Sequence, residues 1–266
     1  MSIVGWHNWV LVGPLLLGAC GARQPMATQP VLDIVEAPDP AQVKLDLAEA
    51  LIEDGRANAA LAMLSSLRTD GHRTPELDVL QAKALRELGL LNDAETMLVE
   101  VVDRHPRLAV AYGELGVLYL DKKDIEKAIS ALQSAVRWDK DNPKYLNNLG
   151  FALMAGGQPE EAVDVLRHAL RTTGSSAQTR GNLGFALVAA GKTDEALRVF
   201  VAQGSMAQAH YNIGVGLEAQ GRFEAAQASY RASLATHQDY EPAILALKRL
   251  DPTFQGPTTV PKEEEQ

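Results

Sequence analysis

The chain has 266 residues, with 25 Lys and Arg against 34 Asp and Glu, and so carries a formal net charge of −9. This acidic balance, without any basic block, excludes the clustered cations with which a nucleic-acid interface neutralises phosphates. The single cysteine excludes an internal disulfide and any structural zinc site built from four cysteines or from two cysteines and two histidines.

The amino terminus has the pattern of an export signal. Residues 1–19 contain no Lys, Arg, Asp or Glu, and a short apolar run from Val10 to Leu17 precedes Gly18, Ala19 and Cys20. This run is shorter than the roughly 20 apolar residues that span a bilayer. We therefore expect a cleaved signal peptide over 1–19 and no retained transmembrane helix.

The motif Leu17-Gly18-Ala19-Cys20 resembles the lipobox of bacterial lipoproteins. The resemblance implies that Cys20 becomes the lipid-modified first residue of the mature chain. The next residue is glycine instead of aspartate, which resembles the outer-membrane class. We expect a lipid-anchored protein of the bacterial outer membrane that faces the periplasm. The alternative is ordinary cleavage after Ala19, which leaves a free thiol at Cys20.

Two proline-bearing segments flank the part of the chain that we expect to fold. Residues 20–40 combine Cys20 with four prolines and show no sustained periodicity, which is typical of a tether. Residues 251–266 hold three prolines and the run Glu263-Glu264-Glu265, which predicts a disordered acidic tail. The folded part should therefore lie between these two segments.

Between the two segments one pattern recurs six times. An alanine returns every 34 residues, and once after 30. The alanines are Ala60, Ala94, Ala128, Ala162, Ala196 and Ala226. A small residue stands twelve positions before each alanine, and a glycine stands five positions before it in every repeat except the third, which has Lys123. Because glycine readily ends a helix in the left-handed conformation, each period predicts two helices joined by a tight turn.

This period, with its W-x2-L-G-x2-Y and A-x3-F positions, resembles the tetratricopeptide repeat. The resemblance implies an all-α fold, an α-solenoid of about six helical hairpins over 41–250. We place the repeats at 41–74, 75–108, 109–142, 143–176, 177–206 and 207–240, with a partial capping helix at 241–250. The fifth repeat is four residues short, so we expect its second helix to end early, at Gly204.

No catalytic or metal-binding motif interrupts the repeats. The six histidines are scattered without the spacing of a metal site, and neither a nucleophile elbow nor a phosphate-binding glycine loop occurs. Acidic residues near the starts of second helices, such as Asp93, are explained by the helix dipole. We predict a protein without enzymatic activity, cofactor or metal.

The resemblance also implies a concave surface lined by the first helix of each hairpin. One position on that surface reads Asp46, Leu80, Glu114, Asn148, Asn182 and Asn212, so asparagine fills it in the last three repeats. An asparagine offers both a donor and an acceptor, which suit the C=O and N–H of a peptide bond. We predict a groove that binds a protein or peptide segment. Its residues are Asn148, Asn182, Asn212, Asn147, Phe151, Phe185 and Tyr211.

The first half of this surface should be acidic, since Glu49, Glu53, Glu87 and Asp121 fall on it. An alternative to the binding groove stays open. Asparagine is common at this position of the repeat, and Phe151 and Phe185 could simply pack against neighbouring helices.

Anchor, tether and repeats together predict a membrane-anchored scaffold for protein–protein interactions. They resemble the outer-membrane lipoproteins of type IV and Flp/Tad pilus assembly, where such proteins act as pilotins or assembly factors. This implies an assembly factor for a pilus or secretion apparatus, with a secretin or another envelope component as partner and no nucleic acid. The alternative is a regulatory adaptor of cell-wall hydrolases or of outer-membrane or polysaccharide export machinery.

Overall fold

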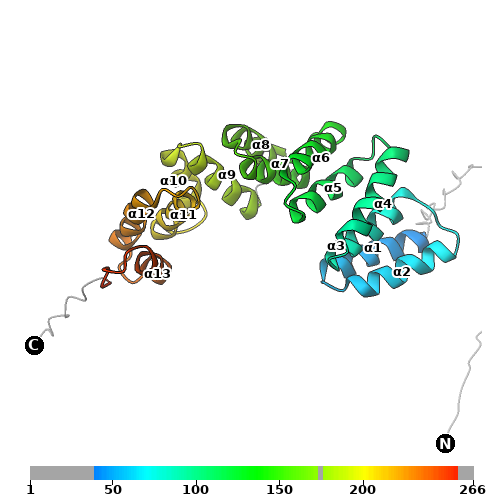
Figure 1. Cartoon of the computed structure of the whole chain (residues 1–266), viewed down its shortest axis with the longest axis horizontal. Helices are drawn as coiled ribbons and strands as arrows, with labels where there is room; N and C mark the ends of the chain where they lie inside the picture. Colours follow the sequence, from blue (N-terminus) through cyan, green and yellow to red (C-terminus); the bar gives the residue numbers. More distant parts are fainter. Residues whose placement is uncertain (1–38, 173–175, 257–266) are drawn as a thin grey trace, which may run out of the picture. The chain divides into compact units, whose positions relative to one another are not determined.

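The structure is a computed structural model that describes residues 39–172 and 176–256. The predicted signal peptide, the lipobox with Cys20, the tether up to residue 38 and the tail from residue 257 lie outside the described residues. The described part forms an all-α solenoid, with thirteen helices and no strand (Figure 1).

Twelve of the helices pair into six consecutive hairpins. The first helices are α1 (Pro40–Glu53), α3 (Pro75–Glu87), α5 (Ala109–Asp121), α7 (Pro143–Ala155), α9 (Ala177–Ala189) and α11 (Met206–Ala219). The second helices are α2 (Ala57–Thr69), α4 (Leu91–Arg104), α6 (Ile125–Trp138), α8 (Pro159–Thr172), α10 (Thr193–Val201) and α12 (Phe223–Thr236). The last helix is α13 (Glu241–Leu250).

Within each hairpin the two helices cross where the recurring small residue of the first helix meets a large residue of the second. At Gly150 of α7 an added Cβ would overlap the side chain of Leu166 on α8, and at Gly214 of α11 it would overlap Tyr230 on α12. The recurring alanine, four positions before each of these large residues, is fully buried in all six hairpins. Small residues therefore allow the close approach of the axes, and large ones fill the contact.

The turn inside each hairpin requires one residue with left-handed backbone. Five of these residues are glycines, with φ between 71° and 77°, as at Gly157. The sixth is Lys123, with φ of 60°, and it is the one non-glycine residue of the described part with a positive φ. The recurring glycine is thus a requirement of backbone conformation, and the third repeat departs from it.

Successive hairpins stack through their first helices. Each first helix packs on the second helix of its own hairpin. It also packs on the second helix of the preceding hairpin and on the first helix of the next hairpin, where these exist. Consecutive second helices share no comparable packing in the described part. The first helices therefore form the inner surface of the stack and the second helices its outer surface (Figure 1).

The fifth hairpin differs from our expectation. Helix α10 has nine residues and ends at Val201, three residues before the predicted end at Gly204. The reason lies in the next helix: Ser205 caps α11, its hydroxyl accepting a hydrogen bond from the backbone N of Gln208 at 3.1 Å. The residues between the two helices must form a turn, so they cannot prolong α10. Phe200 nevertheless stays buried against Gly184.

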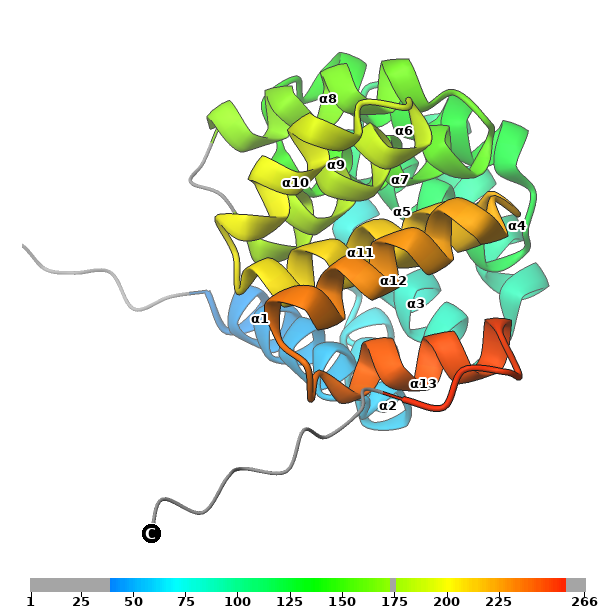
Figure 2. The ribbon, with the colours of Figure 1, turned by 90° about the vertical axis from the view of Figure 1, so that its left-hand side faces the viewer.

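Helix α13 covers the last hairpin by packing on α12 (Figure 2). Its apolar side turns inward at Ala243 and Leu247, while Lys248 and Arg249 are exposed. This distribution is that of a terminal cap, which needs one polar face. No helix in the described ranges is long and apolar enough to cross a membrane.

Candidate binding groove

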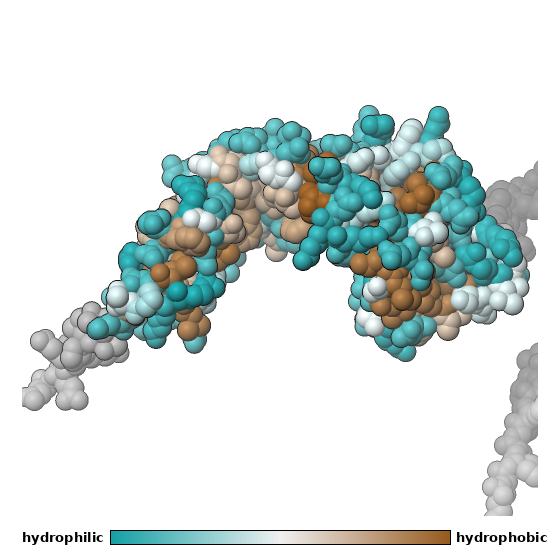
Figure 3. All heavy atoms as spheres, viewed as in Figure 1, coloured by the Kyte–Doolittle hydropathy of each residue, from teal (hydrophilic) through white to brown (hydrophobic). Residues whose placement is uncertain are grey.

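The inner surface has two chemically different halves. We call the part formed by α1, α3 and α5 the charged half, and the part formed by α7, α9 and α11 the asparagine half. The space-filling view shows mostly hydrophilic surface, interrupted by apolar areas over both ends of the stack and near α7 (Figure 3).

Three of the four predicted asparagines are joined by hydrogen bonds across two repeats. Asn182 Nδ2 on α9 donates to Asn147 Oδ1 on α7 at 2.9 Å, and Asn147 Nδ2 donates to Asn148 Oδ1 at 3.5 Å. We call Asn147, Asn148 and Asn182 the asparagine row. Asn147 is buried, whereas Asn148 and Asn182 are half-buried, and Nδ2 of Asn148 and Oδ1 of Asn182 take no part in these two bonds. Asn212, half-buried on α11, lies outside the row.

The three predicted aromatic residues lie in different surroundings. Phe151 on α7 is 48% exposed. Phe185 is half-buried and packs edge-on against Phe200, with 5.3 Å between ring centroids. The alternative of packing against neighbouring helices therefore describes Phe185 and not Phe151.

Tyr211 marks the end of the asparagine half. Its ring lies 5.6 Å from that of Tyr230 and 5.8 Å from that of Tyr240, between centroids. Tyr211 also lines an open pocket of about 560 Å³ together with residues of α13 such as Leu245, which is 57% exposed. An apolar wall thus continues from α11 onto the cap.

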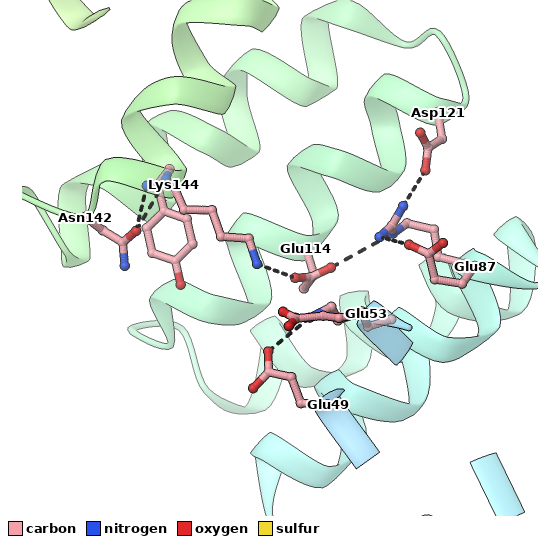
Figure 4. A network of polar contacts seen from close by, with 10 residues as sticks. Glu49, Glu53, Glu87, Glu114, Asp121, Asn142 and Lys144 are labelled. Atoms are coloured by element: carbon pink, nitrogen blue, oxygen red, sulfur yellow. Dashed lines mark hydrogen bonds and ion pairs between the residues drawn. The ribbon is translucent and has the colours of Figure 1, made fainter. Parts of the chain in front are cut away.

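The charged half is less acidic than the sequence suggested, because α3 supplies two cations. Lys83 Nζ lies 3.0 Å from Glu49 Oε1 and 3.8 Å from Glu53 Oε1 (Figure 4). Arg86, one turn further along α3, lies 2.6 Å from a carboxylate oxygen of Glu87 and 2.8 Å from one of Asp121. The four acids predicted to form an acidic surface are thus all paired.

Sequence reasoning missed Lys83 and Arg86 although a signal for them exists. Lys83 follows its partner Glu49 by 34 residues, Arg86 precedes Asp121 by 35, and Asn147 precedes Asn182 by 35. Residues one period apart therefore meet on neighbouring first helices. Comparing each inner residue with its counterpart one repeat later would have found both pairs.

Glu114 on α5 is a buried carboxylate between two cations. It is 6% exposed and lies 3.9 Å from both Arg86 Nε and Lys144 Nζ (Figure 4). Neither its Oε2 nor Arg86 Nε has a hydrogen-bond partner. Nearby, burial above all raises the pKa of Tyr145 to about 12, assisted by the charges of Asp139 and Glu114. This part of the surface holds charges in a poorly hydrated setting.

The part of the chain that the structure describes contains no group of three or more His, Cys, Asp and Glu side chains placed to hold a metal ion. The inner surface combines paired charges, hydrogen-bonding amides and exposed apolar groups. Such a surface can recognise a chain segment by contact.

Comparison with known proteins identifies the repeats. Models of the tetratricopeptide repeat match residues 116–156, 144–174 and 182–241. The chain therefore contains tetratricopeptide repeats, as its period predicted. No curated protein matches the sequence.

Several solved structures share the fold. YrrB, described as a TPR protein with an unusual peptide-binding site, is 23% identical with a TM-score of 0.55, and the match covers 70% of this chain and 97% of YrrB. MamA from Desulfovibrio magneticus RS-1, from residue 41 to its end, is 21% identical over 62% of this chain and 93% of its own, with a TM-score of 0.51. A chain of the APC/C hetero-tetramer Cut9–Hcn1 is 21% identical, with a TM-score of 0.57, over 81% of this chain and 44% of that chain. At these identities the likenesses show the fold alone.

Proposed function

We propose that this chain is a scaffold for protein–protein interactions whose inner surface binds a segment of a partner protein. The observation that carries the proposal is the asparagine row, in which Asn182, Asn147 and Asn148 are linked by hydrogen bonds across α7 and α9. The row holds its amides in place before any ligand arrives, and preorganised groups lose less conformational entropy on binding.

The two bonds of the row leave Nδ2 of Asn148 and Oδ1 of Asn182 available to a ligand. Nδ2 of Asn148 can donate to a backbone C=O, and Oδ1 of Asn182 can accept from a backbone N–H. Phe151, exposed beside them on α7, supplies apolar area. Such a surface suits an extended or helical segment of varied sequence. YrrB, which shares the fold, is described as having a peptide-binding site, and this supports the proposal without defining the ligand.

We further propose that the scaffold is a lipoprotein of the bacterial outer membrane, faces the periplasm and assists assembly of a pilus or secretion apparatus. The support is the sequence Leu17-Gly18-Ala19-Cys20 and the proline-bearing segment that follows it. A secretin or another envelope component would then be the partner. Regulation of cell-wall hydrolases or of export machinery is the competing role, and it requires a different partner.

A photo-crosslinking experiment tests the groove. The photoreactive residue p-benzoylphenylalanine replaces Phe151 on the inner surface or, as matched control, Trp138, which is 43% exposed on the second helix α6. After irradiation of intact cells, a partner should be captured at position 151 and not at 138. Equal capture at both positions would contradict binding on the inner surface. Captured secretin subunits favour the assembly role, and a captured peptidoglycan hydrolase favours the regulator.

The anchor has its own test. Stable membrane attachment takes more than one acyl chain, so a lipoprotein with several chains should stay in the membrane fraction, while Cys20→Ala should be released. The intact mass of the membrane-extracted protein should show a chain that begins at Cys20 and carries lipid. A mature chain without added mass would refute the anchor and leave the groove untouched.

A further inference from the structure

A small pocket opens in the charged half, between α1 and α3 and next to α5. Its volume is about 180 Å³. Its floor is apolar, with Val79 and Leu80 from α3 and Val110 from α5, and its rim carries Asp46, Glu49 and Glu76. The space-filling view shows apolar surface over α1 and α3 (Figure 3). The pocket lies on the same inner surface as the asparagine row.

The carboxylates of the rim are short of cations. No Lys or Arg lines the pocket. Asp46 accepts a hydrogen bond from the amide of Gln42 at 2.7 Å. Neither Asp46 nor Glu76 forms an ion pair in the described part of the chain. Glu49 has Lys83 as its cation, and Lys83 also lies 3.8 Å from Glu53.

A second observation concerns Glu114 on α5, which has cations nearby but lacks a hydrogen-bond partner at one carboxylate oxygen. Glu114, one helical turn after Val110, is 6% exposed, and its Oε2 has no hydrogen-bond partner. Its two cations, Arg86 and Lys144, stay 3.9 Å away. The region beside the pocket therefore holds a buried carboxylate whose hydrogen-bonding capacity is incompletely used, and such a group attracts a further cation.

We propose that this pocket receives an arginine or lysine side chain of the partner segment. Such side chains bury an aliphatic stem on apolar surface while the charged head stays at the rim, which matches a floor of valine and leucine below three carboxylates. An acidic side chain would be repelled there, and a purely apolar one would leave the carboxylates unpaired. The proposal rests on the proposed function, since it assumes that the inner surface holds a protein segment.

The first test uses a defined probe and the full mature chain labelled with ¹³C in its valine and leucine methyl groups. The probe is the blocked pentapeptide Ala-Ala-Arg-Ala-Ala, and its control carries citrulline, a neutral side chain of the same shape. The arginine peptide should shift the methyl signals of Val79 and Leu80, and the citrulline peptide should bind about tenfold more weakly, as loss of a charge-assisted hydrogen bond implies. Equal binding of the two peptides, or shifts elsewhere only, would overturn the proposal.

The second test changes the rim. Asp46→Asn with Glu76→Gln keeps size and removes two exposed charges. The matched control, Glu126→Gln with Glu161→Gln, removes two exposed charges from second helices. The rim variant should bind the arginine peptide about tenfold more weakly and the control should bind it unchanged. An equal loss in both would mean attraction by net charge alone and would overturn the pocket.

The two proposals fail in different ways. If the partner captured at position 151 binds the rim variant as tightly as the natural chain, the pocket proposal is wrong and the scaffold proposal stands. If nothing is captured at position 151 while the arginine peptide still binds the pocket, the asparagine half is not the binding site, and the pocket remains.

Discussion

At Lys123 the backbone adopts a conformation that the other five hairpins give to glycine. A residue with a Cβ in the left-handed region is disfavoured by roughly 1–2 kcal/mol. Glycine avoids this cost, but it also raises the conformational entropy of the unfolded chain, which offsets part of the gain. We expect Lys123→Gly to raise the free energy of unfolding by about 0.5–1 kcal/mol. Urea denaturation followed by circular dichroism measures it.

The matched control is Gly157→Ala, at the equivalent turn of the next hairpin. A Cβ there would meet no atom within 4 Å, so any effect comes from backbone strain at φ of 71°. This variant should lose about 1 kcal/mol. A loss of stability in Lys123→Gly would show that the side chain of Lys123 stabilises the turn by more than its backbone strains it.

For single residues, the sequence predicted the surface on which a side chain lies better than it predicted the hydrogen-bond or ion-pair partner of that side chain. Asn148 and Asn182 fall on the inner surface because their place in the period determines their face. Their hydrogen-bond partners depend on the residue one period away, as Asn147 and Asn182 show. The same applies to Lys83, which pairs with Glu49 and so changes the charge that the acids alone implied.

Between elements, the crossing of α7 and α8 depends on the absence of a side chain at Gly150. An added Cβ would overlap Leu166, and overpacking of this kind costs about 1–3 kcal/mol. We expect Gly150→Ala to lose that much stability. In a Leu166→Ala background, where the space is empty, the same change should cost about 1 kcal/mol less, and a double-mutant cycle measures the coupling.

Gly181→Ala is the control for helix propensity. Gly181 lies inside α9, and a Cβ there would meet nothing within 4 Å. This variant should gain about 0.5–1 kcal/mol, since alanine is the better helix former. A gain of stability for Gly150→Ala as well would mean that α7 and α8 do not approach closely at this point.

The last three helices are joined by one carboxylate. Tyr230 Oη on α12 and Arg249 Nη2 on α13 each donate to Glu218 Oε2 on α11, both at 2.7 Å. Burial of the ring and the adjacent Glu218 raise the pKa of Tyr230. Because the folded chain resists ionisation of this phenol more than the unfolded chain does, stability is full below the unfolded pKa of about 10 and falls as the pH rises above it.

We therefore expect Tyr230→Phe to flatten the loss of stability above about pH 10, at a cost of about 1 kcal/mol near neutrality for the lost hydrogen bond. Glu218→Gln keeps the ring of Tyr230 and removes the adjacent charge. The fall of its stability with pH should therefore be intermediate between that of the natural chain and that of Tyr230→Phe. Tyr145, whose pKa is raised to about 12, should supply part of the remaining slope. Denaturation midpoints across the alkaline range decide this, and identical slopes for Tyr230→Phe and the natural chain would refute it.

At the scale of the whole molecule, the period predicted the architecture because each repeat can bury its apolar stripe only against a neighbour. It predicted less well where one repeat adjusts to the next. Helix α10 ends at Val201 because Ser205 caps α11, and the surroundings of Phe185 depend on Phe200 of the neighbouring helix. Such details depend on side-chain volumes and caps, which the period does not encode.

The asparagines make a prediction for the molecule as a binding surface. We expect Asn148→Ala, Asn182→Ala and Asn212→Ala together to weaken binding of the captured partner by roughly 1.5–4.5 kcal/mol, since each neutral hydrogen bond contributes about 0.5–1.5 kcal/mol. Isothermal titration measures this loss. Stability should fall by the two bonds that Asn148 and Asn182 make with Asn147, again about 0.5–1.5 kcal/mol each, and by little more, because all three substituted side chains are partly exposed.

The control for this variant carries three changes in the charged half, Glu53→Gln, Glu87→Gln and Asp121→Asn. These side chains already pair with Lys83 or Arg86 and do not line the pocket beside α1. Partner affinity should change little, because partly exposed ion pairs are screened and contribute little to distant contacts. If the control instead loses affinity while the asparagine variant keeps it, the partner lies along α3 and α5, and the asparagines only connect the repeats.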